Sequence, residues 1–282
     1  MDFFSQQGRE ETLSGGNHAG NADMPFKPGV LVISHGSPDP EWVGLVDEAV
    51  AAAAADLPDT LPVEASFLEI VEGRLIQDGI DRLEAQGVSD LIVIPLFVSS
   101  GSTHIDEIAY ALGVKNTPEK ETDMKRLRIS ARVFFGDPVD DDPVIAEMVW
   151  DKVKALSSKP EREILLLVGH GSIHEGFLQR WERGISSLAA RTGKLSGLAG
   201  ADFALLNPDS LRRKVSYWSE ERGYDVIVAP LFLSAGYFTK TAIPSRLTGL
   251  IFRYSGDALL PHPFLARWMY GQILNIMKSL SL

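Results

Sequence analysis

The feature of this sequence that most constrains its fold is an internal repeat. The segment GVLVISHGS (residues 29–37) returns as ILLLVGHGS (residues 164–172), and DLIVIPLFVSSG (residues 90–101) returns as DVIVAPLFLSAG (residues 225–236). In both pairs the second copy begins 135 residues after the first. Two independent landmarks at one spacing indicate a duplicated unit of about 130 residues, which is an ordinary domain size.

Each unit has the sequence pattern of an α/β domain, because short apolar runs typical of buried strands alternate with helical stretches. In the first unit we expect strands at residues 30–33, 62–70, 91–98 and 128–135, and helices at residues 41–55, 74–86, from about 105, and 143–156. Such alternation predicts a parallel sheet covered by helices on both faces. The expected fold is therefore α/β, with two similar doubly wound parallel-sheet domains and a cleft between them.

The polar stretch SSKPERE (residues 157–163) marks the boundary between the units. We expect an N-terminal domain over residues 27–158 and a C-terminal domain over residues 159–282, which ends in an amphipathic helix. Residues 1–26 are rich in Gly, Asn, Ser and acidic residues and are expected to form a disordered leader.

The composition excludes several classes of function. The chain has no cysteine, so disulfides, thiolate metal sites and cysteine nucleophiles are absent. A net charge of −11 argues against a nucleic-acid-binding surface. No apolar run reaches the roughly 18 residues that span a bilayer, and the N-terminus does not resemble a secretory signal. We expect a cytoplasmic protein that binds neither membranes nor nucleic acid.

Three reactive side chains follow successive strands of the first unit. His35 comes directly after the first strand, Glu69 stands at the end of the second, and His104 lies in the turn after the third. Because ligands bind outside the carboxyl ends of parallel strands, the three should meet at one edge of the sheet. Two neutral imidazoles and a carboxylate suit Fe, Co, Ni or Zn, and the same groups accept protons.

The residues around the two histidines suggest supporting roles. The glycines after His35 and before His104 let the backbone approach a flat ligand. Glu107 is expected to serve the start of a helix. For Asp106, that role and the delivery of a cation to His104 both stay open.

These motifs resemble the sirohydrochlorin chelatases, small ATP-independent enzymes of sirohaem and cobalamin biosynthesis. The resemblance rests on HGS after the first strand, FLE after the second and PLFVSSGSTHIDEI after the third. It covers residues 29–113 best and residues 164–249 more weakly. It implies a chelatase-like fold and the insertion of Fe²⁺ or Co²⁺ into sirohydrochlorin, with His35, Glu69 and His104 as metal-binding and catalytic residues. It also implies that no cofactor is required.

The second unit lacks most of these side chains. His170 keeps the first position, Ala204 or Leu205 takes the second, and Thr239 takes the third. A lone histidine is a poor transition-metal site, so we expect a degenerate copy that forms the other wall of the cleft. The alternative is that His170 faces the first site; a ligand pair of His170 with His174 on one helix is disfavoured.

A substrate with many carboxylates needs basic groups in this acidic protein. The first candidate is Lys240, one position beyond the counterpart of His104, and Arg74 and Arg246 are further candidates. Other expected substrate contacts are the small residues beside the histidines, namely Gly36, Ser37, Ser100, Gly101 and Ser102.

Two other functions stay open: a bilobal metal or tetrapyrrole carrier, and a metal-dependent hydrolase. The hydrolase lacks the extra carboxylates of a two-metal site and has no GxSxG nucleophile turn. The choice among Co²⁺, Fe²⁺ and Ni²⁺ is open, as is that between a monomer and a dimer.

Overall fold

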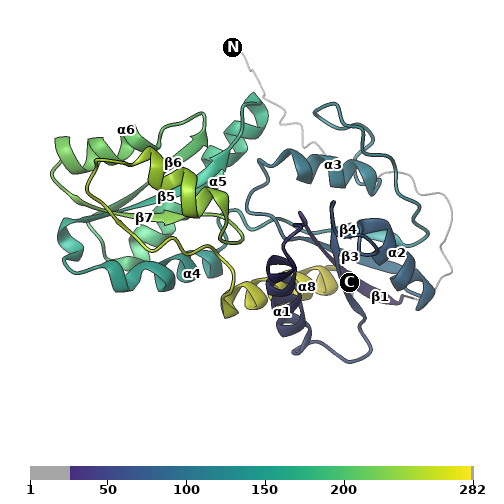
Figure 1. Ribbon diagram of the computed structural model, residues 1–282. Helices are drawn as coiled ribbons and strands as arrows, with labels where there is room; N and C mark the ends of the chain where they lie inside the picture. The colour runs from purple at the N-terminus through teal and green to yellow at the C-terminus, as the bar shows by residue number, and fades with distance from the viewer. Residues whose placement is uncertain (1–25, 281–282) are drawn as a thin grey trace, which may run out of the picture.

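The computed structural model describes residues 26–280, so the leader expected at residues 1–26 lies almost entirely outside the described residues. It contains two four-stranded parallel sheets (Figure 1). The first has the order β2-β1-β3-β4, formed by β1 (Pro28–Ser34), β2 (Val63–Phe67), β3 (Asp90–Pro95) and β4 (Arg132–Phe135). The second has the equivalent order β6-β5-β7-β8, formed by β5 (Glu163–Gly171), β6 (Gly200–Asn207), β7 (Asp225–Pro230) and β8 (Arg253–Tyr254). The predicted pair of similar α/β domains is confirmed.

Helices cover both faces of the sheets: α1 (Pro40–Ala54), α2 (Ile76–Ala85), α3 (Thr103–Ala111), α4 (Pro143–Val153), α5 (Glu175–Ser196), α6 (Leu211–Ser216), α7 (Ile243–Arg246) and α8 (Pro263–Leu280). Local sequence sets their ends. Asp39 caps α1 by accepting a hydrogen bond from the Glu41 N–H, and proline follows it at the first helical position. Between residues 26 and 280, no helix has the length and apolar character needed to cross a membrane.

Strand alternation divides the core into layers. In β1, Val30 and Val32 face one layer while Leu31 and Ile33 face the other, and all four are buried. One layer of the first sheet lies under α2 and α3. The opposite layer is continuous with the corresponding layer of the second sheet, since one cluster of buried side chains contains both Val32 and Leu167. The two sheets therefore share part of their core.

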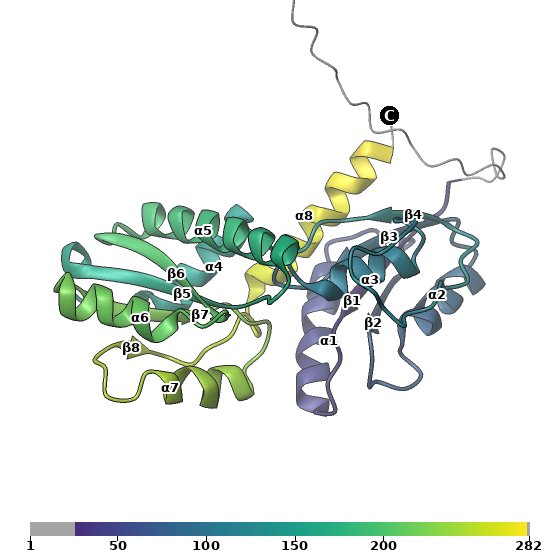
Figure 2. The ribbon, with the colours of Figure 1, turned by 90° about the horizontal axis from the view of Figure 1, so that it is seen from above.

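The closing helices of the two units are exchanged. Helix α4 follows the first sheet in sequence, yet it packs on α5 and β7 of the second unit. Helix α8 follows the second sheet, yet it packs on α1 and β3 of the first (Figures 1 and 2). The boundary expected near residue 158 separates the two sheets, while each unit supplies one covering helix to the other.

Three predicted strands were too long. Residues 91–98 were expected to form a strand, but β3 ends at Pro95. Residues 62–70 were expected to be extended, but β2 ends at Phe67, and the backbone turns through Ile70 with φ = 72°. Residues 128–135 were expected to form a strand, but β4 begins only at Arg132. The Arg128 and Ser130 N–H groups donate to side chains of α2 instead of to a neighbouring strand. Hydrogen bonds to the side chains of Gln77 and Glu84 thus take the place of the strand pairing that was predicted for residues 128–131.

Candidate active site

His35 and Glu69 are brought together by the backbone at the ends of β1 and β2. The Glu69 N–H donates to the His35 carbonyl over 3.1 Å. This close approach requires glycine at position 36, where φ is +107° and a Cβ atom would lie 2.1 Å from the Glu69 carbonyl oxygen. Consequently His35 Nε2 lies 3.6 Å from Glu69 Oε1. Gly36 thus sets the distance between His35 and Glu69. The sequence suggested that this glycine allows a flat ligand to approach the backbone, but in the structure it allows the backbone of Glu69 to approach.

His104 reaches the same place from α3. The helix begins at Thr103, two residues earlier than expected, so His104 stands in its first turn. The His104 ring lies 4.8 Å from the His35 ring, centroid to centroid, at an interplanar angle of 77°. His35, Glu69 and His104 therefore lie side by side at the carboxyl edge of the first sheet.

Hydrogen-bond partners define which ring nitrogen of each histidine is free. His35 Nδ1 lies 3.2 Å from the Gly36 carbonyl, and His104 Nδ1 lies 3.0 Å from Glu107 Oε2. A carbonyl or an ionised carboxylate only accepts, so each Nδ1 carries the hydrogen in the neutral ring. Each Nε2 then keeps its lone pair, and that of His35 faces the Glu69 carboxylate. A proton or a metal ion between the two would satisfy both groups.

Asp106 and Glu107, the acidic neighbours of His104, have other roles than the sequence predicted. Glu107, expected only to serve the helix terminus, orients the His104 ring. Asp106 is 2% exposed and accepts from Lys115 Nζ and from the Glu119 N–H, so its role is structural. The helical spacing placed both residues in the first turn but did not show which side chain faces the histidine.

The three side chains do not form a closed metal cage. Within residues 26–280, no three His, Asp or Glu side chains lie close enough to hold a metal ion ready-made. The side chains of His35 and Glu69 are 42% and 54% exposed. The pair is therefore open to solvent.

A cavity of about 560 Å³ joins this site to the second unit. From the first unit it is lined by residues that include His35, Phe97, Gly101, Ser102, His104 and Lys120. From the second it is lined by residues that include His170, His174, Asn207, Phe232 and Phe238. The cleft expected between the domains is thus present, and His170 faces the same cavity as the first site.

The second unit repeats the backbone of the site with other side chains. His170 Nδ1 lies 3.1 Å from the Gly171 carbonyl, as His35 does from Gly36. A Cβ at Gly171 would meet the Asn207 carbonyl at 2.0 Å, so Asn207 is the counterpart of Glu69. The predicted counterparts, Ala204 and Leu205, were wrong because α5 is longer than α1, so that 37 residues separate Asn207 from His170 (207 − 170) but only 34 separate Glu69 from His35 (69 − 35). An amide therefore replaces the carboxylate, and Asn207 Nδ2 lies 3.5 Å from His170 Nε2.

The counterpart of His104 was also assigned wrongly. Thr239 is 1% exposed, and its hydroxyl bonds to the backbone of Gly236. Phe238 instead places its ring 5.1 Å from that of His170 at 88°, the arrangement that His104 has with His35. A local π-helical turn at Phe238–Ala242 shifts the register by one residue. The second unit therefore presents histidine, asparagine and phenylalanine, which agrees with a degenerate site.

Several expected substrate contacts lie away from the cavity. Gly101 and Ser102 line it, whereas Gly36, Ser37, Ser100 and Lys240 are not among the lining residues. Lys240 is exposed, because the π-helical turn buries Thr239 and directs its neighbour outward.

Gly101 mainly permits close packing between the units. A Cβ there would lie 2.5 Å from the Phe177 carbonyl of α5. Gly101 therefore allows α5 to approach closely, and it also lines the cavity, so the expected approach of a flat ligand there stays a prediction.

The remaining basic candidates are held by acidic partners. Arg74 binds Asp47 through two hydrogen bonds of 2.6 and 2.9 Å, which raise its pKa. Arg246 lies 3.4 Å from Asp209. The basic residue that does line the cavity is Lys120, in the long connection between α3 and β4, where no periodic pattern singled it out. Nor does His174 pair with His170 on a helix, since His170 ends β5 and His174 caps α5.

Fold and site together define an α/β protein with two parallel-sheet units and a histidine-lined cleft between their carboxyl edges. The chain belongs to the CbiX family, whose profile matches residues 29–156 and again residues 164–275. The two matched segments coincide with the two halves of the repeat.

Curated relatives have about the length of one unit. The sirohydrochlorin cobaltochelatase of Methanopyrus kandleri is 27% identical over 138 residues, which cover 44% of this chain and 94% of the relative. That of Methanothermobacter thermautotrophicus is 29% identical over 144 residues, which cover 48% and 96%. Each relative therefore corresponds to half of the duplicated chain.

Solved structures share the two-unit fold. SirB from Bacillus subtilis, solved with Fe³⁺, matches with a TM-score of 0.72 at 18% identity, over 89% of this chain and 96% of its own. CbiX of denitrifying bacteria, described as the terminal enzyme for siroheme biosynthesis, matches with a TM-score of 0.59 at 17% identity, over 88% and 98%. At these identities the likeness concerns the fold.

Proposed function

We propose that this protein is a chelatase that inserts a divalent metal ion into sirohydrochlorin, with His35, Glu69 and His104 as the reacting residues. The observation that carries the proposal is the set of two imidazoles and a carboxylate at the mouth of an interunit cavity. Membership of the CbiX family and the names of its relatives support the choice of substrate.

Insertion requires three operations: removing water from the ion, presenting it to the ring face and taking two protons from the pyrrole nitrogens. The free Nε2 atoms of His35 and His104 are neutral nitrogen ligands for the ion. As the metal leaves for the ring, the Nε2 atoms of His35, beside Glu69, and of His104 can each accept one of the two protons. The apolar side chains that line the cavity, Phe97 among them, suit the flat macrocycle. No cofactor is needed for this reaction, and the metal ion is a substrate.

The identity of the metal is part of the proposal. Co²⁺ and Fe²⁺ are the first candidates and Ni²⁺ a third, since imidazole nitrogen accepts all of them and availability decides in cells. The cytoplasmic location and the choice between monomer and dimer stay predictions.

The test is a spectrophotometric insertion assay with purified protein, metal-free sirohydrochlorin and each of the three metal ions. We expect turnover by the wild type and loss of most activity in His35→Ala and His104→Ala, with circular dichroism unchanged. His170→Ala should lose far less, because Asn207 and Phe238 leave it without metal-binding partners. Near-normal turnover in His104→Ala would contradict the proposed site.

The same assay decides between a chelatase and a carrier. A carrier would bind metal or tetrapyrrole without accelerating insertion above the uncatalysed rate. The metal-dependent hydrolase has no further support, since the described residues lining the cavity include no carboxylate that would hold a second metal.

A further inference from the structure

The cavity has an unusual charge for a protein of net charge −11. Its described lining contains no Asp, Glu or Arg, and Lys120 is its one permanently charged residue. No carboxylate or carbonyl among residues 26–280 pairs with the Lys120 ammonium. An unpaired cation in a cavity lined otherwise by uncharged side chains and histidines can bind an anionic group of a ligand.

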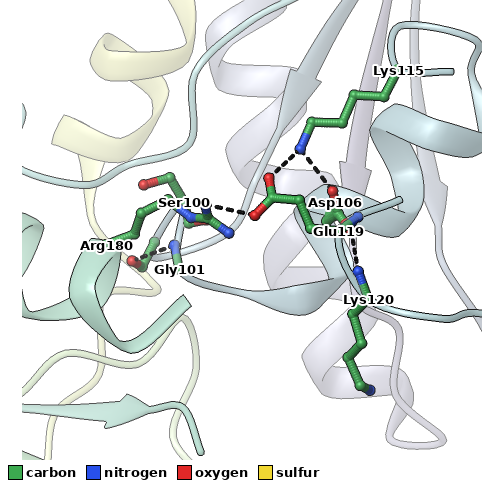
Figure 3. Close-up of polar contacts among 8 residues, drawn as sticks. Ser100, Gly101, Asp106, Lys115, Glu119, Lys120 and Arg180 are labelled. Atoms are coloured by element: carbon green, nitrogen blue, oxygen red, sulfur yellow. Dashed lines mark hydrogen bonds and ion pairs between the residues drawn. The ribbon is translucent and has the colours of Figure 1, made fainter. Parts of the chain in front are cut away.

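The backbone of Lys120 is fixed by buried Asp106. Asp106 Oδ2 accepts from the Glu119 N–H at 2.7 Å and from the Lys120 N–H at 3.3 Å, while Asp106 Oδ1 accepts from Lys115 Nζ at 2.7 Å. Figure 3 shows the Lys120 side chain extending away from this cluster. Asp106 thus binds the side chain of Lys115 and the backbone of Glu119 and Lys120. Among the described residues, the ammonium group of Lys120 stays free.

Arg180 of the second unit also helps to hold the segment that carries Lys120. Glu119 Oε1 accepts from Lys115, and Glu119 Oε2 accepts from Arg180 of α5 at 2.9 Å. Arg180 Nε also donates to the Ser100 carbonyl at 3.1 Å, in the loop that leads to His104 (Figure 3). One arginine therefore links the segment that carries Lys120 with the loop that precedes His104.

We propose that Lys120 binds a carboxylate of the tetrapyrrole and orients the ring over His35 and His104. This inference rests on the proposed function and names the residue that recognises the charge of the substrate. Asp106, Glu119 and Arg180 are positioning residues for it.

The experiment measures the affinity of purified protein for metal-free sirohydrochlorin by fluorescence titration at low and high salt. Lys120→Met should raise Kd about tenfold at low salt, the effect of one charge-assisted hydrogen bond. It should also reduce the salt dependence of binding, because an ion pair with the substrate is screened by salt. Lys120→Arg should restore most of the affinity.

A matched control separates recognition from a general effect of charge. Lys125 is exposed in the same connection and does not line the cavity, so Lys125→Met should bind as the wild type does. Lys120→Met should raise KM for sirohydrochlorin, while its affinity for Co²⁺ in the absence of the tetrapyrrole should stay close to that of the wild type. Fully methyl-esterified sirohydrochlorin should not distinguish Lys120→Met from wild type.

Two results would overturn the inference while leaving the chelatase proposal intact: wild-type affinity and salt dependence in Lys120→Met, or an equal loss in Lys125→Met. Failure of the wild type to bind or metallate sirohydrochlorin would instead overturn the proposed function, and this inference with it.

Discussion

At the scale of single residues, the two units share the backbone that positions one histidine at the end of the first strand. They differ in the side chain that faces Nε2 of that histidine. His35 Nε2 faces the Glu69 carboxylate, whereas His170 Nε2 faces the Asn207 amide. A carboxylate attracts a cation or proton to the imidazole, while an amide N–H occupies its lone pair. The second unit therefore lacks the negative charge beside its histidine, in addition to the second imidazole that Phe238 replaces.

Glu107 provides a test at this scale. Glu107→Gln keeps an oxygen that can accept from His104 Nδ1 but removes the negative charge beside the ring. We expect insertion activity to fall about ten- to a hundredfold, as for other residues that orient a metal-binding histidine. Steady-state kinetics should place the loss in kcat, with KM for the tetrapyrrole unchanged. A wild-type kcat would show that the 3.0 Å contact has no catalytic role.

At the scale of elements, buried Glu163 fixes the start of β5 to the segment that joins the units. It accepts from the Ser158 and Lys159 N–H groups and from Arg253 of β8. Burial alone would raise the pKa of Glu163, but these hydrogen bonds and one from Ser157 lower it to about 2. The junction that the sequence marked as a polar stretch is thus held by Glu163 and by Arg253, which also donates to the Leu156 carbonyl and the Ser158 hydroxyl.

The lowered pKa predicts how stability depends on pH. The contribution of ionised Glu163 is complete above its ordinary pKa of about 4.5 and is lost as the pH falls toward 2. It amounts to at most about 3.5 kcal/mol, since the pKa falls from 4.5 to about 2, that is by about 2.5, and one pKa unit corresponds to about 1.4 kcal/mol. Glu163→Gln should be less stable than wild type at pH 7 and should lose less stability between pH 4.5 and 2. Urea unfolding at several pH values measures both, and equal pH dependence in the two proteins would contradict the prediction.

At the scale of the whole molecule, the exchanged helices make the two units interdependent. Helix α4 buries Ile145, Met148 and Val149, and α8 buries Trp268 and Met269, each in contact with the other unit. Either unit cut at the sequence boundary would expose one apolar helix face and lose the cover of another.

This exchange predicts the behaviour of fragments. Residues 27–158 alone should aggregate or unfold without cooperativity, because α4 lacks α5 and the first sheet lacks α8. The matched control is residues 27–142 joined by a flexible linker to residues 263–280, which replaces α4 with the helix that covers the first sheet. Thermal unfolding followed by circular dichroism should be cooperative only for the second fragment. Cooperative unfolding of residues 27–158 at wild-type stability would contradict this account.

The sequence by itself determined the two α/β units and placed His35, Glu69 and His104 at one edge of a sheet. It could do so because strand and helix periodicity are local, and because parallel strands present their carboxyl ends together. Only the tertiary structure decided which sheet each closing helix covers, since an amphipathic helix specifies an apolar face but not the surface that it meets. It also decided that Asn207 and Phe238 replace Glu69 and His104, because a longer helix before β6 and a π-helical turn after β7 shift the register without changing the repeat. Lys120 reaches the cavity for the same kind of reason: contacts with Asp106 and, through Glu119, with Arg180, distant in sequence, hold its segment in place.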